Sequence, residues 1–160
     1  MTHSPRPLVP LSHQETVLTI PHVDPRGPRF GAALTTIVLI VVLLTGSAWL
    51  LAAQAVVFAL GASLGVSRSP YGWLFRFAVR PRLAPPAELE DARPPRFAQG
   101  VGLAFAVVGL IGYLSGATVL GVIATAFALA AAFLNAAFAF CLGCEIYLLL
   151  RRLRRSPATA

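Results

Sequence analysis

Two long stretches without a charged residue constrain the fold of this chain more than any other feature. The first extends from Phe30 to about Val66, and a short interruption, Thr45-Gly46-Ser47, divides it into two apolar runs. Together these runs exceed thirty residues, whereas about 20 helical residues cross a hydrocarbon core about 30 Å thick. A pair of antiparallel helices that turns back at Thr45-Gly46-Ser47 accounts for this length.

The second stretch repeats this organisation in the C-terminal half. One apolar run follows Pro95-Arg96-Phe97 and ends near Leu114, and another extends from Ala117 to about Phe140, with Ser115-Gly116 between them. We therefore predict an all-α integral membrane protein with four transmembrane helices, arranged as two duplicated helical hairpins.

The last apolar run is longer than one crossing requires. Apolar character continues to Leu150, and a straight helix from Ala117 to Leu150 would measure roughly 50 Å at about 1.5 Å per residue. The sequence therefore predicts that this helix tilts, protrudes or breaks, and Gly143 is the expected position of a break.

The composition also indicates a membrane protein. Hydrophobic residues make up 57% of the chain and charged residues 12%, whereas charged residues make up roughly a quarter of soluble domains. All 13 basic residues are arginine, and the net charge is +7. These arginines border the apolar runs and form no stripe with interleaved aromatic residues, so we expect no nucleic-acid partner. The expected partner is the lipid bilayer.

An internal repeat relates the two halves. The motif Asp24-x-Arg26-x-Pro28-Arg29-Phe30 corresponds to Asp91-x-Arg93-x-Pro95-Arg96-Phe97 at a constant offset of 67 residues. Each motif precedes two apolar runs joined by small residues, so we predict repeat halves at about residues 24–80 and 91–153. Repeats with an even number of spans insert in the same orientation, which predicts a pseudo-twofold axis along the membrane normal.

The distribution of arginine predicts the orientation. Arginine occurs in both tails and in the central connection, whereas both turns are uncharged. The positive-inside rule then places both termini and the central connection in the cytoplasm. We divide the chain into a flexible cytoplasmic N-terminal tail (residues 1–29), a four-helix membrane domain (30–153) and a C-terminal tail (154–160).

Several polar and aromatic residues carry weaker expectations. The segment from Tyr71 to Val79 mixes aromatic and basic residues, as is typical of the membrane surface. Gln54 and Asn135 lie inside the apolar runs, and each is expected to hydrogen-bond a neighbouring helix. His3, His13 and His22 lack the i, i+4 spacing of helical metal ligands, so exposed side chains are expected in the N-terminal tail.

The motif that suggests chemistry is Phe140-Cys141-Leu142-Gly143-Cys144-Glu145. It holds both cysteines of the chain at the C-x-x-C spacing of a redox or metal-binding dithiol. Cysteine also packs as a small apolar residue in buried helices, and the spacing alone leaves that interpretation open. Because about 20 residues from Ala117 reach Phe138, we expect the motif at the cytoplasmic edge of the membrane.

Three residues of this motif receive hypothetical roles. At i, i+3 on a helix, Cys141 and Cys144 share a face and lie close enough for a disulfide after modest local adjustment. We expect Cys141 to be the attacking thiol and Cys144 the resolving thiol. Glu145 adjoins Cys144 and is expected either to oppose a thiolate there or, when protonated, to exchange a proton with the thiol.

Three motifs together resemble those of a known family: Val23 to Phe30, Glu90 to Gly100, and Phe140 to Glu145. They resemble the bacterial membrane protein family catalogued as domain of unknown function 4395, over about residues 20–153. The resemblance implies a small protein of the bacterial inner membrane with a suspected link to sulfur or thioredoxin chemistry. Cys141 and Cys144 match the C-x-G-C position of the family, which implies no catalytic assignment.

Three functions are compatible with the sequence. We rank first a membrane thiol–disulfide or sulfur relay with a soluble thioredoxin-like or sulfurtransferase partner, because few polar residues line the spans. The second is a small permease for a sulfur compound. The third is a structural module in which two copies of the chain pool their cysteines around one metal ion, since two ligands cannot complete a tetrahedral site. The sequence predicts no cofactor.

Overall fold

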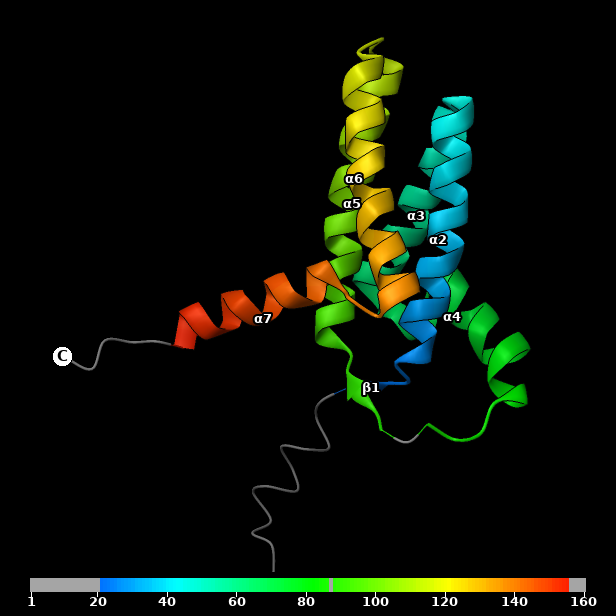
Figure 1. The fold of residues 1–160 in the computed structure, drawn as a ribbon, viewed down its shortest axis with the longest axis vertical. Coiled ribbons are helices and arrows are strands. Elements are labelled where there is room, and N and C mark those ends of the chain that lie inside the picture. The colour runs from blue at the N-terminus through cyan, green and yellow to red at the C-terminus, as the bar shows by residue number, and fades with distance from the viewer. Residues whose placement is uncertain (1–20, 87, 156–160) are drawn as a thin grey trace, which may run out of the picture.

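The computed structural model describes residues 21–86 and 88–155, which form a largely helical fold (Figure 1). The elements in chain order are β1 (His22–Val23), α2 (Arg26–Thr45), α3 (Ala48–Leu64), η1 (Val66–Arg68), α4 (Pro70–Leu74), η2 (Phe75–Val79), η3 (Arg80–Arg82), β2 (Glu90–Asp91), α5 (Arg93–Leu114), α6 (Thr118–Phe138) and α7 (Leu142–Arg155). Most of the expected N-terminal tail, with His3 and His13, lies outside the described residues. Residues 21–29 of that tail contain β1 and the first turn of α2.

Both halves begin their first helix with the same cap. The Asp24 carboxylate accepts a hydrogen bond from the Arg26 backbone N–H (3.0 Å) and pairs with the Arg26 guanidinium (3.1 Å). The Asp91 carboxylate accepts a hydrogen bond from the Arg93 N–H (2.9 Å). Such side chains satisfy N–H groups that have no partner inside the helix. As a result, α2 and α5 begin slightly before the apolar runs.

The two expected turns are confirmed. Gly46 adopts a left-handed conformation (φ 64°), and its N–H donates to the Val42 carbonyl (2.8 Å) at the end of α2. Ser47 then caps α3 by accepting a hydrogen bond from the Leu50 N–H (3.3 Å). Gly116 has φ 80° between α5 and α6. Residues with a side chain rarely adopt these φ values, which explains the glycine in each turn.

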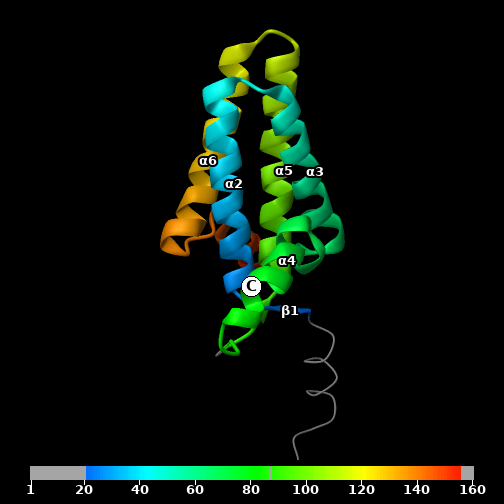
Figure 2. The same cartoon turned by 90° about the vertical axis from the view of Figure 1, so that its right-hand side faces the viewer.

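Helices α2, α3, α5 and α6 form a bundle of two helical hairpins with both turns at the same end (Figure 1, Figure 2). α2 packs against α6, and α3 packs against α5. The buried core of this bundle consists of Leu39, Val42, Leu51, Ala55, Phe58, Ala106 and Ala128. The central connection and α7 lie toward the opposite end (Figure 1).

A short antiparallel ladder joins the starts of the two halves. β1 pairs with β2, with His22 opposite Asp91 and Val23 opposite Glu90. The Ala92 N–H donates to the Pro21 carbonyl (2.9 Å) beside this ladder. The small extent of this sheet agrees with the all-α prediction for the chain.

The surface of the bundle is apolar. Three helices, α2, α5 and α6, are long and apolar enough to cross a membrane, and α3 is apolar but has 17 residues. Large side chains such as Leu44, Trp49 and Phe127 are exposed, whereas Gln54 and Thr125 are fully buried. This distribution is consistent with a membrane protein, in which lipid covers the outer surface of the helices.

An arginine from α5 closes the C-terminal end of α3. The Nε atom of Arg96 donates to the Ala62 carbonyl (2.6 Å), and the same guanidinium donates to the Ser63 carbonyl. The last carbonyl groups of a helix have no partner inside it, and a cation is favourable at that end. Arg96 therefore links the end of one hairpin to the start of the other.

The last apolar run breaks, but not at Gly143. α6 ends where Ala139 adopts a left-handed conformation (φ 56°), with its N–H donating to the Asn135 carbonyl (3.1 Å). α7 then extends sideways from the bundle (Figure 1). Gly143 lies in the first turn of α7, and a Cβ there would be 2.6 Å from the Cβ of Ala98. The expected break at Gly143 is therefore wrong: this glycine permits α7 to pack closely on α5.

Candidate functional site

Cys141 and Cys144 form a disulfide at the N-terminus of α7, with their Cα atoms 5.2 Å apart. The Cys141 carbonyl accepts a hydrogen bond from the Glu145 N–H (3.1 Å), and the Cys141 Sγ accepts one from the Cys144 N–H (3.3 Å). Cys141 therefore occupies the N-cap position, and Cys144 lies in the first turn. The break in the last apolar run therefore lies before this motif, and not between the two cysteines as expected.

The N-cap position distinguishes the two sulfur atoms. The N-terminus of a helix presents unpaired N–H groups and a partial positive charge, and both stabilise an anion. When the disulfide is reduced, a thiolate on Cys141 receives this stabilisation. Thiolates in such positions are the reactive nucleophiles of C-x-x-C motifs. The helix N-terminus thus distinguishes Cys141 from Cys144, and the attacking role of Cys141 stays a prediction.

Glu145 follows Cys144 directly at the start of α7. Its side chain is exposed in the first turn of α7, where a carboxylate interacts favourably with the helix dipole. It does not line the cavity beside Cys141. The expected proton exchange between Glu145 and Cys144 stays a prediction.

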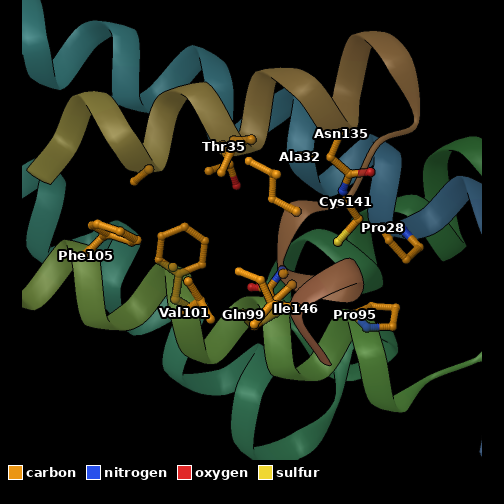
Figure 3. Close-up of a pocket in the computed structure, with 18 of the residues that line it drawn as sticks. Pro28, Ala32, Thr35, Pro95, Gln99, Val101, Phe105, Asn135, Cys141 and Ile146 are labelled. Atoms are coloured by element: carbon orange, nitrogen blue, oxygen red, sulfur yellow. The ribbon is translucent and has the colours of Figure 1, made fainter. Parts of the chain in front are cut away.

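A cavity of about 260 Å³ lies between the two hairpins, next to the disulfide. Its walls come from α2, α3, α5, α6 and the start of α7, and they include Cys141 but not Cys144. Figure 3 shows Cys141, Pro28 and Pro95 toward one end of this cavity and Phe105 toward the other. The cysteine expected to attack is thus the one that lines this cavity.

A chain of hydrogen bonds leads from the central connection to the cavity wall. The Tyr71 hydroxyl donates to Gln54 Oε1 (2.8 Å), and Gln54 Nε2 donates to Thr35 Oγ1 (3.3 Å). Thr35 lines the cavity. The expected hydrogen bond from Gln54 to a neighbouring helix is confirmed. Burial raises the pKa of Tyr71, which lies in α4 outside the long helices.

Two further amides line the cavity, Gln99 from α5 and Asn135 from α6. Neither side-chain amide forms a hydrogen bond with another described residue. The expected bond from Asn135 to a neighbouring helix is therefore not found in the described part of the chain. Gln99 and Thr35 were not expected at this site, since nothing in the local sequence indicates which residues line a cavity.

The described residues contain no group of three or more side chains suited to hold a metal ion. Cys141 and Cys144 alone supply two thiolates, half of a tetrahedral zinc site.

These features define a class: a small helical protein of the membrane type, with a C-x-x-C disulfide at the start of a helix beside a cavity between two helical hairpins. A comparison with protein families identifies the particular family. The family described as "Domain of unknown function (DUF4395)" matches residues 23–152, and the chain belongs to it. This match confirms the resemblance seen in the sequence motifs. A search of curated proteins and a search of solved structures each returned no match.

Proposed function

We propose that this protein is an integral membrane thiol–disulfide relay that exchanges electrons with a soluble thioredoxin-like partner. The observation that carries the proposal is the half-buried disulfide at the N-terminus of α7, with the Cys144 N–H bonded to the Cys141 sulfur. Both cysteines lie outside the buried core and are partly exposed, as contact with a soluble protein requires. A helix N-terminus also stabilises the thiolate that such exchange requires. Transfer of sulfane sulfur to a sulfurtransferase partner would use the same thiol.

The exchange needs no group besides the two pairs of thiols. A partner thiolate attacks Cys141, a new S–S bond forms, and the bond to Cys144 breaks to release a thiolate. The second thiolate of the partner then attacks the mixed disulfide and releases Cys141. The partner loses two electrons, and the Cys141–Cys144 pair gains two electrons and takes up two protons. In the reverse direction Cys141 attacks and Cys144 resolves.

We further propose that all four helices of the bundle cross the membrane. α3 measures about 25 Å at 1.5 Å per residue, slightly less than a hydrocarbon core of about 30 Å. Both turns lie at one end of the bundle (Figure 2). If α2, α5 and α6 cross, α3 must return the chain to the side on which α5 begins.

The duplication of the hairpins has support from the packing of the helices. In the sequence repeat, α2 corresponds to α5 and α3 corresponds to α6. A twofold axis that exchanges them converts the contact between α2 and α6 into the contact between α5 and α3. Both of these contacts are extensive. We therefore propose that the fold arose from two copies of one helical hairpin.

The proposed location is the bacterial inner membrane, with both termini in the cytoplasm. The arginines of α7 and of the central connection lie at the same end of the bundle, and the two turns carry no charge. α7 has exposed apolar side chains, Ile146, Leu149 and Leu153, beside Arg151 and Arg152. This composition suits a helix that lies in the membrane surface.

Trapping of a mixed disulfide tests the relay. In native membranes, the Cys144→Ser variant is expected to accumulate adducts on Cys141 that run as larger species on a non-reducing gel. Cys141→Ser is the matched control and should accumulate far fewer adducts, because Cys144 lacks the N-cap position. The relay is wrong if neither variant forms adducts and the double serine variant grows like wild type on every sulfur source and under oxidative stress.

A small permease for a sulfur compound is the second candidate function, and the cavity between the hairpins favours it. Uptake of a labelled sulfur compound by proteoliposomes, unchanged by replacement of both cysteines, would support the permease in place of the relay. The structural module with a shared thiolate site predicts a dimer of this chain with stoichiometric bound zinc.

A further inference from the structure

We propose that the cavity beside Cys141 binds the ring of a lipid-soluble quinone, and that this quinone oxidises the reduced Cys141–Cys144 pair. The inference rests on the proposed relay and adds its electron acceptor at the same site.

The lining of the cavity selects a neutral ligand. No charged side chain is among its lining residues, which are mostly Ala, Gly, Pro, Phe and other apolar residues. An ion without a charged partner in such surroundings is strongly disfavoured. Charged sulfur oxyanions and hydrophilic oxidants therefore do not suit the cavity, whereas an uncharged lipophilic molecule does.

The size and position of the cavity suit an aromatic ring. A cavity of about 150 Å³ holds benzene, so a cavity of about 260 Å³ has room for a ring with several substituents. Phe127 and Ile146 belong to its wall and are 60% and 45% exposed, so the cavity opens at the surface of the bundle. A ligand ring inside the cavity can therefore carry an apolar tail that leaves toward the lipid.

The unpaired amides suit the carbonyl groups of a quinone. A quinone has two carbonyl oxygens at opposite ends of its ring, and each oxygen accepts hydrogen bonds. Figure 3 shows Gln99 and Asn135 on opposite walls of the cavity. Each amide carries N–H donors that form no hydrogen bond with another described residue. Thr35 Oγ1 already accepts a hydrogen bond from Gln54, which leaves its own O–H free to donate.

The redox step balances with these two reactants alone. As the S–S bond between Cys141 and Cys144 forms, the two thiols lose two electrons and two protons. The two carbonyl oxygens of the quinone receive them and become the hydroxyl groups of a quinol. The quinol returns to the lipid, and the regenerated disulfide accepts the next electron pair from a partner dithiol.

The test uses the full-length protein in proteoliposomes, reduced and freed of reductant, with decylubiquinone as the probe. We expect quinol to form in proportion to the thiol pairs lost, as measured by quinone absorbance and by alkylation of the remaining thiols. Ala131→Phe fills the cavity, and Asn135→Leu removes an amide donor. Each is expected to slow oxidation about tenfold, because ring position depends on cavity shape and on a few polar groups.

A matched control adds the same aromatic ring outside the cavity. Ala130 neighbours Ala131 on α6, but its side chain is exposed and does not line the cavity. The Ala130→Phe variant should therefore be oxidised at the wild-type rate. Circular dichroism and thermal unfolding confirm that each variant is folded before its rate is compared.

A second measurement separates binding from redox chemistry. The double variant Cys141→Ser, Cys144→Ser cannot be oxidised, and excess decylubiquinone should still raise its unfolding temperature, because a ligand that binds only the folded state stabilises it. Addition of Ala131→Phe to this variant should abolish the increase.

The outcomes distinguish this inference from the relay itself. If Cys144→Ser traps a partner but decylubiquinone leaves the wild-type thiols reduced, the quinone inference is overturned and the relay stands. Folded Ala131→Phe and Asn135→Leu variants that react as fast as wild type would also overturn it. If quinone oxidation depends on the cavity but no partner is trapped, the quinone site stands and the thioredoxin-like partner is wrong.

Discussion

Val23 and Glu90 face each other across the ladder between β1 and β2, and they hold equivalent positions in the two sequence repeats. The offset of 67 between the repeat motifs carries residue 23 onto residue 90. A twofold axis that relates two antiparallel strands must pass between equivalent residues. Val23 and Glu90 are such a pair, and they lie just before α2 and α5, the first helices of the two halves.

Gly143 gives the sharpest test of how α7 is held. Gly143→Ala places a Cβ against Ala98 and is expected to destabilise the protein by about 1–3 kcal/mol. Thermal unfolding in detergent and protease cleavage within α7 measure this effect. The control is Gly100→Ala in α5, where a Cβ has nothing within 4 Å and should stabilise the helix by up to about 1 kcal/mol. Equal effects of the two substitutions would contradict the close contact.

The two cysteines should differ in reactivity once reduced. The N-cap position favours the thiolate of Cys141 by interactions typical of a helix dipole, so Cys141 in the Cys144→Ser variant should alkylate about 2- to 5-fold faster than Cys144 in the Cys141→Ser variant. The rates of labelling of the two folded variants at neutral pH check this. The same rates measured after denaturation are the control for intrinsic reactivity. Faster labelling of Cys144 would reverse the assigned roles.

Tyr71 is expected to make the stability of the folded protein fall at alkaline pH. Because burial raises the pKa of its phenol above 10.0, the folded state keeps a proton that the unfolded state releases. The contribution of Tyr71 to stability is therefore complete below about pH 10 and is lost as the pH rises further. Tyr71→Phe should flatten this alkaline decline in thermal unfolding.

The same variant should cost about 1 kcal/mol at neutral pH, because it removes the hydrogen bond to Gln54. Tyr113→Phe is the control: the Tyr113 hydroxyl is buried without a hydrogen-bond partner among the described residues, so its removal should cost nothing. An unchanged alkaline decline in Tyr71→Phe would show that another group causes it.

The orientation can be tested with a reporter that is active only outside the cytoplasm. Fusion at Ala160 should be silent, and insertion near Gly46 or Gly116 should be active, because both turns are expected on the far side of the membrane. Fusions of similar expression level provide the control. The reverse pattern of activity would refute the proposed topology.

The helices and turns could be predicted because their signals are local. Uncharged runs set the helix lengths, and Gly46 and Gly116 supply the positive φ angles of the two turns. The break before α7 could not be placed in the same way. Ala139 adopts a left-handed conformation without any local signal for it, and Gly143, the expected break, is required instead by contact with Ala98 on a distant helix.

The candidate site was predictable only in part, for a related reason. The C-x-x-C spacing predicted a dithiol at Cys141 and Cys144, since this signal lies within a few consecutive residues. The cavity depends on five helices that meet in space. Gln99 belongs to a sequence motif and Asn135 to an apolar run, and only their packing brings them to the same internal space.

The contact of Arg96 with the end of α3 bears on how short α3 can be. A helix end usually reaches water, which bonds its last carbonyl groups, but here a guanidinium from α5 bonds Ala62 and Ser63. α3 therefore does not need to extend into the aqueous phase to satisfy its backbone. If α3 crosses the membrane as proposed, the arginine takes the place of water at its end, and a helix of 17 residues can lie beside helices of 20 to 22 residues.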